Sequence, residues 1–311
     1  MPQSFTEERR VVRTVRGDIR PDELGACDAH QHLFLTTPLQ PGEDFLDVAP
    51  AIEEAQTLAA AGARALIDWT PIGLGRDLDG LATVSKASGL HIVGATGLHR
   101  DAHYLNDDPL RNERLEVLVE RFVADAGRCG IIKVGASYHH LTPFEQKVFE
   151  AAASAHARTG LPVCVHTEHG TMGLDLVVRL RELGVPPQSV VLAHLDRNPD
   201  AGEHGETGAT GAWLQLDGPG RAKYWPNSTI LQLIAGLAER GLAEQLLVGG
   251  DTGRRMTMRA YGGGPGLDYV FARFKPRLEA ELGSELAERI FVTNPRSAFS
   301  FQPRTPAAAT G

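Results

Sequence analysis

The sequence predicts an α/β protein with a (β/α)8 barrel, the TIM-barrel architecture, preceded by a short N-terminal β extension. Three observations lead to this prediction. Short apolar runs rich in β-branched residues alternate with helical stretches along nearly the whole chain, these runs number eight, and no glycine-rich dinucleotide fingerprint follows the first of them. Alternating strands and helices form a parallel sheet, and eight such units favour a closed barrel over an open sheet.

The eight predicted strands are short and apolar, as strands buried on both faces of a parallel sheet should be. In chain order they cover residues 24–29, 64–69, 91–95, 131–134, 162–165, 190–193, 212–216 and 245–248.

The helices between these strands have recognisable ends. Asp108 before Pro109 predicts a helix start, and Thr142-Pro143-Phe144-Glu145 predicts a capping box with proline at the first helical position. The segment NPDAGEHGETGATG, residues 198–211, is rich in glycine, so any helix there should be short. Glycines that precede the next strand predict four helix ends, at Gly62, Gly160, Gly184 and Gly241.

Length and composition suit one soluble domain. We expect this domain to cover residues 1–302, because a barrel of about 250 residues or more commonly forms a single domain. The tail PRTPAAATG, residues 303–311, is expected to be disordered. The chain has 31 Lys plus Arg against 39 Asp plus Glu, a net charge of −8, which argues against a nucleic-acid partner.

Cysteine usage and the N-terminus indicate a cytoplasmic protein. Cys27, Cys129 and Cys164 form no C-x-x-C pair, so neither a disulfide framework nor a thiolate zinc site is expected. The N-terminus is charged and lacks the apolar stretch of a signal peptide. No apolar run approaches the length of a membrane span, so we expect no membrane association.

Polar residues within or just after the predicted strands are the candidates for chemistry, because barrels place their active sites at the C-terminal ends of the strands. Alternation along a strand points His30 and His32 the same way, so both imidazoles can reach one metal ion. Each candidate alone is more often a structural residue, but their convergence at one end of a barrel predicts a metal site. The candidates are His30, His32, Lys133, His166, His194 and Asp251.

With these residues in place, the chain resembles the phosphotriesterase-like family of the amidohydrolase superfamily, from RTVRGDIRPDELG to NPRSAFSF. The resemblance implies two adjacent divalent metal ions, usually zinc, with manganese or cobalt as alternatives. It implies that His30, His32 and Asp251 bind the first metal. It also implies that His166 and His194 bind the second, and that a carboxylated Lys133 bridges the two.

The resemblance makes Lys133 and Asp251 the catalytic residues. A lysine with its ordinary pKa of about 10.4 is a cation that repels metal ions. Reaction with carbon dioxide would give an anionic carbamate whose two oxygens can span two metals. The expected nucleophile is a hydroxide shared by the metals, whose parent water has its pKa lowered toward ~7. Asp251 is placed to accept its proton and pass it to the leaving group.

Cationic residues after the seventh and eighth strands suggest an anionic substrate. Lys223 and Arg254 lie beside glycines in the pair of loops that often binds phosphate in barrels. They also resemble the phosphate-binding positions of lactonases that act on phosphorylated sugar lactones. Further candidate substrate-binding residues are Arg255, Tyr261 and His99, the last at a position where many lactonases of the family carry tyrosine. The roles of His103, His139, His140 and His169 stay open.

Three functions are compatible with the sequence. The first is a lactonase that opens a phosphorylated sugar γ-lactone. The second is a lactonase for hydrophobic or homoserine lactones with incidental phosphotriesterase activity, which should prefer apolar residues where Lys223 and Arg254 stand. The third is a metal-binding barrel without catalysis, which the presence of all six ligands disfavours. The partner is therefore a small-molecule lactone or phosphoester. The substrate's stereochemistry, the native metal and the oligomeric state stay open, a homodimer included.

Overall fold

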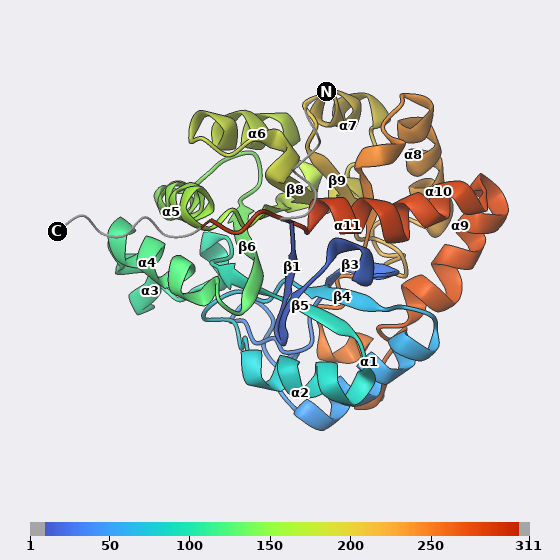
Figure 1. The fold of residues 1–311 in the computed structure, drawn as a ribbon, viewed down its shortest axis with the longest axis horizontal. Coiled ribbons are helices and arrows are strands. Elements are labelled where there is room, and N and C mark those ends of the chain that lie inside the picture. Colours follow the sequence, from blue (N-terminus) through green and yellow to red (C-terminus); the bar gives the residue numbers. More distant parts are fainter. Residues whose placement is uncertain (1–9, 305–311) are drawn as a thin grey trace, which may run out of the picture.

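The computed structural model describes residues 10–304, and its centre is a parallel sheet of eight strands rolled into a nearly closed barrel (Figure 1). Each strand pairs with its neighbours in the sequence, which confirms the predicted architecture. The barrel strands are β3 (Cys27–Gln31), β4 (Ala65–Asp68), β5 (His91–Gly97), β6 (Cys129–Ala136), β7 (Val163–Thr167), β8 (Val190–Ala193), β9 (Trp213–Leu216) and β10 (Leu246–Val248).

Helices surround this barrel on its outside (Figure 1). Two layers of apolar side chains follow from the alternation of the strands. On β6, Ile131 points into the barrel interior, whereas Ile132 and Val134 pack in the layer shared with the helices. The helices are α1 (Val48–Ala60), α2 (Leu78–Ser88), α3 (Pro109–Asn112), α4 (Leu115–Asp125), α5 (Pro143–Thr159), α6 (Gly173–Glu182), α7 (Ala201–Gly208), α8 (Asn227–Glu239), α9 (Lys275–Leu282), α10 (Ser284–Glu288) and α11 (Asn294–Ala298).

The barrel closes between its first and last strands through the carbonyl oxygen of His30. The amides of Gly250 and Asp251 donate hydrogen bonds to this oxygen at 3.1 and 2.8 Å. The backbones approach closely here, because a Cβ added at Gly249 would lie 2.6 Å from the His30 amide nitrogen. Closure therefore brings Asp251 beside His30, although the two residues come from opposite ends of the chain.

The predicted helix ends are confirmed. Asp108 accepts a hydrogen bond from the Leu110 amide at the start of α3, and Thr142 and Glu145 form a capping box at the start of α5. The glycine-rich segment forms only the short helix α7. All four predicted terminal glycines adopt positive φ after their helices, namely Gly62, Gly160, Gly184 and Gly241.

The strand bounds differ most from the prediction at β3 and β6. β3 begins at Cys27 and not at Leu24, because a 3-10 turn occupies Pro21–Glu23 and Gly25 takes a φ of +67°, so the chain becomes extended only later. β6 extends beyond the predicted 131–134 at both ends, because it pairs with β5 from Cys129 and with β7 as far as Ala136. Sequence patterns mark the apolar centre of a strand better than its ends.

The predicted N-terminal extension is an antiparallel hairpin of β1 (Val12–Thr14) and β2 (Gly17–Ile19). Just before it, Val11 exchanges two backbone hydrogen bonds with Phe301, both 2.9 Å long, so the two ends of the described chain meet. The disorder predicted for 303–311 concerns mainly residues 305–311, which lie outside the described residues. Within that tail, the Arg304 side chain donates a hydrogen bond to the Ala157 carbonyl at 2.8 Å.

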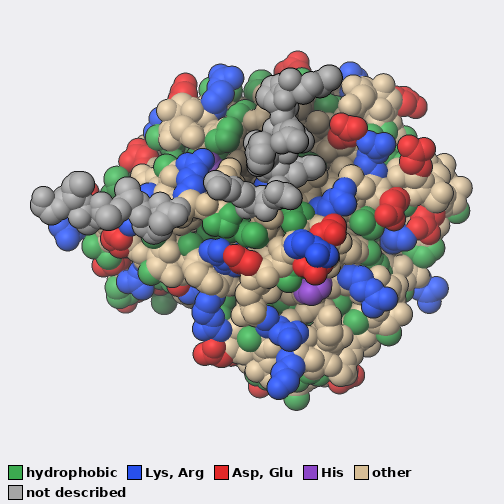
Figure 2. All heavy atoms as spheres, in the orientation of Figure 1, with side chains coloured by type: hydrophobic (Ala, Val, Ile, Leu, Met, Phe, Trp, Pro, Cys, Tyr) green, Lys and Arg blue, Asp and Glu red, His purple; other side chains and the backbone are tan. Residues whose placement is uncertain are grey.

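The surface charges, the cysteines and the helix lengths relate to the predictions about partners, disulfides and membrane association. On the face shown in Figure 2, positive and negative side chains of the described residues are interspersed. All three cysteines are buried and free. Between residues 10 and 304, no helix has both the length and the apolar character needed to cross a bilayer.

Candidate metal centre

The six predicted ligands converge at the C-terminal ends of the barrel strands. His30 and Lys133 lie on β3 and β6, His166 lies on β7, and the other three directly follow β3, β8 and β10. All six are buried and line one cavity of about 300 Å³, and they are His30, His32, Lys133, His166, His194 and Asp251. Because the strands are parallel and their ends share one rim, residues far apart in sequence meet here.

Three of these residues have the spacing that a metal ion requires. Oδ1 of Asp251 is 3.6 Å from Nε2 of His30 and 3.3 Å from Nε2 of His32. A tetrahedral ion with ligands at about 2.0–2.1 Å separates neighbouring donor atoms by about 3.4 Å. His30, His32 and Asp251 therefore fit one metal ion without rearrangement.

The imidazoles are held so that one ring nitrogen of each remains available. Thr70 Oγ1 lies 2.9 Å from Nδ1 of His32, and Glu168 Oε2 lies 2.7 Å from Nε2 of His166. Among the described residues, Nε2 of His30 and Nδ1 of His166 are buried without a hydrogen-bond partner. Buried nitrogens rarely stay unpaired, and metal-binding histidines commonly have the opposite nitrogen fixed in this way. The donor set therefore fits resident metal ions.

Asp217 was not predicted as a site residue, yet it joins a second convergent group with His30 and His194. Its Oδ2 accepts a hydrogen bond from the His194 amide at 3.0 Å and lies 3.2 Å from Nδ1 of His30. Its Oδ1 accepts from Gln215 at 2.9 Å, and burial raises the pKa of Asp217 to about 7. Because both oxygens are engaged by the protein, we interpret Asp217 as a residue that orients His30 and His194.

Lys133 is 1% exposed, and its Nζ lies 4.5 Å from the centroid of the Trp69 ring. The same indole stacks on His30 with a centroid distance of 4.0 Å. Burial lowers the pKa of Lys133 to about 8, although the charge of Asp251 acts in the opposite direction. A larger fraction of this amine is therefore neutral near pH 7–8 than for an exposed lysine.

Two arginines that were not predicted as site residues contact the carboxylate of Asp251. Its Oδ2 lies 3.1 Å from Nη2 of Arg197 and accepts a further hydrogen bond from Arg221. Burial alone would raise the pKa of Asp251, but the Arg221 guanidinium and the nearby histidines hold it well below its ordinary value. His194 and Asp251 both have positive φ, 69° and 45°. Non-glycine residues in this region are uncommon and cluster at functional sites.

The predicted substrate-binding residues divide into two groups. Lys223, Arg254 and His99 line the cavity with the metal ligands. Arg255 and Tyr261 are not among its lining residues. The Arg255 guanidinium lies 4.3 Å from the Tyr261 ring centroid, and the Tyr261 hydroxyl donates to Asp47.

The four histidines whose roles stayed open lie in three different places. His103 stacks on His99 with a centroid distance of 3.8 Å and lines the same cavity. His139 and His169 line a neighbouring cavity, whereas His140 is exposed and bonds to the Tyr138 carbonyl.

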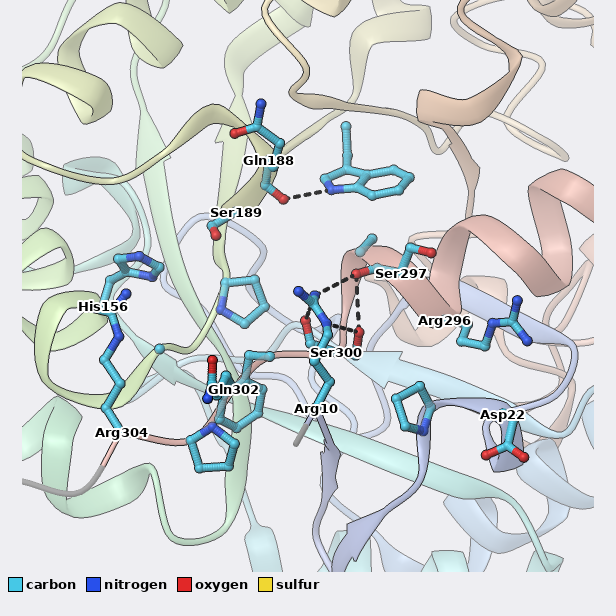
Figure 3. Close-up of a pocket in the computed structure, with 17 residues that line it drawn as sticks. Arg10, Asp22, His156, Gln188, Ser189, Arg296, Ser297, Ser300, Gln302 and Arg304 are labelled. Carbon is cyan, nitrogen blue, oxygen red and sulfur yellow. Dashed lines mark hydrogen bonds between the residues drawn. The ribbon is translucent and has the colours of Figure 1, made fainter. Parts of the chain in front are cut away.

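A larger cavity, of about 980 Å³, lies at the opposite end of the barrel (Figure 3). Its wall includes Pro162 and Ser189, which precede β7 and β8. Arg10 spans part of it and donates hydrogen bonds to Ser297 and Ser300. None of the predicted metal ligands lines this cavity. The smaller cavity, of about 300 Å³, is therefore the candidate site.

Comparisons with known proteins agree with this geometry. A phospho-furanose lactonase of Mycoplasmopsis synoviae is 30% identical over 96% of this chain and 94% of its own length. The crystal structure of a lactonase from Listeria monocytogenes has a TM-score of 0.88 and 29% identity, covering 94% of this chain and 99% of that one. The phosphotriesterase homology protein of Escherichia coli, solved with phosphate in its active site, has a TM-score of 0.83 and 28% identity, covering 89% and 99%. The sequence profile of the phosphotriesterase family matches residues 10–299, and the chain belongs to this family.

Proposed function

We propose that the protein is a metal-dependent lactonase that opens a phosphorylated sugar γ-lactone. The observation that carries the proposal is that two cations, Lys223 and Arg254, line the same cavity as the six predicted metal ligands. A substrate with an anionic group near its scissile ester would contact both sets of residues at once. The names of the related phospho-furanose lactonases support this choice of substrate class.

We infer that the centre holds two divalent cations, with zinc as the expected metal and manganese or cobalt as alternatives. His30, His32 and Asp251 would hold one cation, and His166 and His194 the other. When bound, the pair would lower the pKa of a shared water and polarise the carbonyl oxygen of the substrate.

Lys133 would bridge the two cations as a carbamate. The neutral amine adds to carbon dioxide, forming an N–C bond and releasing one proton, and the product is an anion with two oxygens. The lowered pKa of Lys133, about 8, favours this reaction because it increases the neutral fraction of the amine. An uncarboxylated ammonium at this buried position would repel the cations.

Asp251 would move the proton that the reaction releases. Its carboxylate would accept the proton of the attacking water and deliver it to the ring oxygen of the lactone, which leaves as an alcohol. Arg197 and Arg221 hold its Oδ2, so its position is fixed during this transfer. Bond formation to the carbonyl carbon and cleavage of the ring C–O bond then leave a hydroxy acid.

Other cavity residues would orient the substrate. Arg254 presents a planar fork suited to two phosphate oxygens, and Lys223 acts as a point charge. Nδ1 of His99 accepts a hydrogen bond from the Arg100 amide at 2.7 Å, so the ring proton lies on Nε2. His99 would therefore offer an uncharged N–H donor to a substrate oxygen.

A second candidate function, a lactonase for hydrophobic lactones, is favoured by one observation. Leu35 and Leu39 also line the cavity, and Leu39 is 45% exposed, so an alkyl chain could contact both. The cations in the same cavity argue against this alternative, since an alkyl chain would leave their charges unpaired.

The test is turnover of matched phosphorylated and unphosphorylated γ-lactones by protein loaded with zinc, manganese or cobalt, with acid release followed by pH indicator. A preference for the phosphorylated lactone is expected. A preference for long-chain lactones would favour the second candidate. No turnover of either class would favour a metal-binding barrel without catalysis.

A further inference from the structure

A second cavity, which we call the side cavity, opens next to the catalytic cavity. It has a volume of about 850 Å³, and Arg100, Glu168 and Arg197 line both cavities. The remaining wall comes from the loops after β6 to β9 and from the start of α7, and its ring side chains are Tyr138, His139, His169 and Trp225. A compact phosphorylated lactone in the catalytic cavity would leave this volume free.

Most charged groups of the side cavity already have protein partners. Arg100 Nε lies 3.0 Å from Glu168 Oε2, and Glu203 accepts a hydrogen bond at 2.8 Å from the neutral side chain of Asn198. Arg197 contacts Asp251 and lies 4.9 Å from the Tyr224 ring centroid. An occupant with a full charge would have to compete with these contacts, so the wall favours an uncharged one.

The ring side chains leave surfaces free for such an occupant. Tyr138 is 57% exposed and Trp225 is 40% exposed, although both line the cavity. The Trp225 indole N–H donates to the Arg197 carbonyl at 3.2 Å, which fixes the ring while its faces remain accessible. Large aromatic rings interspersed with a few polar groups are typical of small-molecule sites.

The backbone adopts an unfavourable conformation at two of the residues that carry these rings. His139 and His169 have φ values of 55° and 56°, two of five positive values at non-glycine residues in the described chain. The His139 ring meets the Tyr138 ring at 4.4 Å and the His169 ring meets it at 5.9 Å, measured between centroids. Such strain persists where the surrounding structure maintains it, commonly at binding sites.

We propose that the side cavity is a second subsite, which binds an uncharged, hydroxylated ring of the substrate beyond the bond that is cleaved. This inference rests on the proposed function, because it extends a substrate whose anionic group occupies the side of Lys223 and Arg254. Tyr138 and Trp225 would contact the apolar faces of the ring. The side-chain oxygen of Asn198 and the second carboxylate oxygen of Glu203, which take no part in the hydrogen bond between these two residues, would accept hydrogen bonds from its hydroxyl groups. A sugar ring has this combination, whereas an alkyl chain or a second phosphate does not.

The test is equilibrium binding of methyl β-D-glucopyranoside to the metal-loaded protein, measured by saturation-transfer NMR. Tyr138→Ala and Trp225→Ala should each weaken binding by roughly two- to tenfold, the range for loss of one aromatic contact. Leu105→Ala is the matched control, because Leu105 is 60% exposed and lines neither cavity. Saturating inorganic phosphate should not displace the glucoside, since the two would occupy different cavities.

Four results would overturn the inference. The first is that the glucoside does not bind up to its solubility limit, and the second is that phosphate displaces it. The third is that neither substitution weakens its binding. The fourth is that Trp225→Ala weakens binding of 1-hexanol, an alkyl probe, and leaves glucoside binding unchanged. Failure of the proposed function is separate: a wild type that binds the glucoside but turns over no lactone contradicts the function alone. A wild type that turns over phosphorylated lactone without binding the glucoside contradicts only the subsite. Thermal melts of the variants serve as the check that these substitutions leave the fold intact.

Discussion

Nδ1 of His30 lies 3.2 Å from Oδ2 of Asp217, and this contact fixes which nitrogen of the imidazole faces the cavity. Nε2, the opposite nitrogen, is buried without a hydrogen-bond partner in the described chain and points toward Asp251. A carboxylate that orients a histidine in this way commonly increases metal affinity by one to two orders of magnitude. We infer that Asp217 orients residues of the candidate metal centre without itself binding a metal ion.

Replacing Asp217 by asparagine should therefore weaken metal binding. The amide keeps the shape of the side chain but replaces one of its two acceptor oxygens with an NH2 donor, so the contacts with Gln215, His30 and the His194 amide cannot all be kept. We expect metal affinity to fall by about 10- to 100-fold, measured by competition with a chelator. Asp200→Asn, an exposed cap of α7 remote from the metal centre, is the control. Equal affinities for wild type and Asp217→Asn would contradict the orienting role.

Two metal ions per chain are expected in protein purified without chelator. The physical reason is that two sets of predicted donors line one cavity, and Lys133 lines the same cavity as a candidate bridge. Elemental analysis, with stepwise removal and re-addition of metal, measures the ratio. A single tight metal, with no further activity on adding a second equivalent, would show that the centre is mononuclear.

Lys133→Ala should lose the bridging anion, and with it most of the second metal and nearly all turnover. The cavity left behind can accept a small carboxylate, so added acetate or propionate should restore part of both. Metal content and turnover are measured with and without these anions. Normal metal content and turnover in the unrescued variant would make Lys133 a wall residue of the barrel.

Lys223→Met and Arg254→Met should each reduce kcat/KM on a phosphorylated lactone by roughly tenfold or more. A charge-assisted hydrogen bond contributes about 1.5–3 kcal/mol, and 1.4 kcal/mol corresponds to a factor of ten. Turnover of an unphosphorylated lactone and the metal content should both stay unchanged. Arg255→Met is a matched control, because Arg255 is adjacent in sequence but does not line the cavity. Equal losses on both lactones would assign Lys223 and Arg254 a structural role.

His156 should make the folded protein less stable in mild acid. It is 2% exposed, its Nδ1 donates to the Leu161 carbonyl at 2.7 Å, and burial lowers its pKa below the ordinary value of about 6.5. Below pH ~6.5 the unfolded chain binds a proton that the folded chain does not. Stability from this group is therefore complete above that pH and declines as the pH falls toward the lower folded-state pKa.

The measurement is urea unfolding of wild type and His156→Gln at pH 7.5 and at pH 5.5. Gln at this position cannot titrate, so the stability difference between the two proteins should shrink in acid, by at most about 1.4 kcal/mol per pH unit. His140→Gln, at an exposed histidine, controls for loss of any titratable imidazole. A difference that is the same at both pH values would show that His156 is not linked to acid sensitivity.

The sequence by itself determined the eight strands and the six candidate ligands that converge on one cavity. Both depend on local patterns: apolar runs of strand length, and alternation that places Lys133 on the same face of β6 as the interior residue Ile131. In a parallel barrel, the end of each strand lies on one rim, so a residue's place along its own strand is enough to assign it to the site.

Only the tertiary structure decided what surrounds those ligands. No local pattern distinguishes four of the surrounding residues from other polar residues after the strands, namely Glu168, Arg197, Asp217 and Arg221. Arg254 and Arg255 are adjacent and equally cationic, yet only Arg254 lines the cavity. Their roles depend on distances between loops from different strands, which closure of the barrel through His30 and Asp251 sets. The side cavity likewise forms from the loops after five strands and from the start of α7, and no single segment of the sequence contains it. Local periodicity determines which way a side chain points, whereas packing between distant loops determines what it meets.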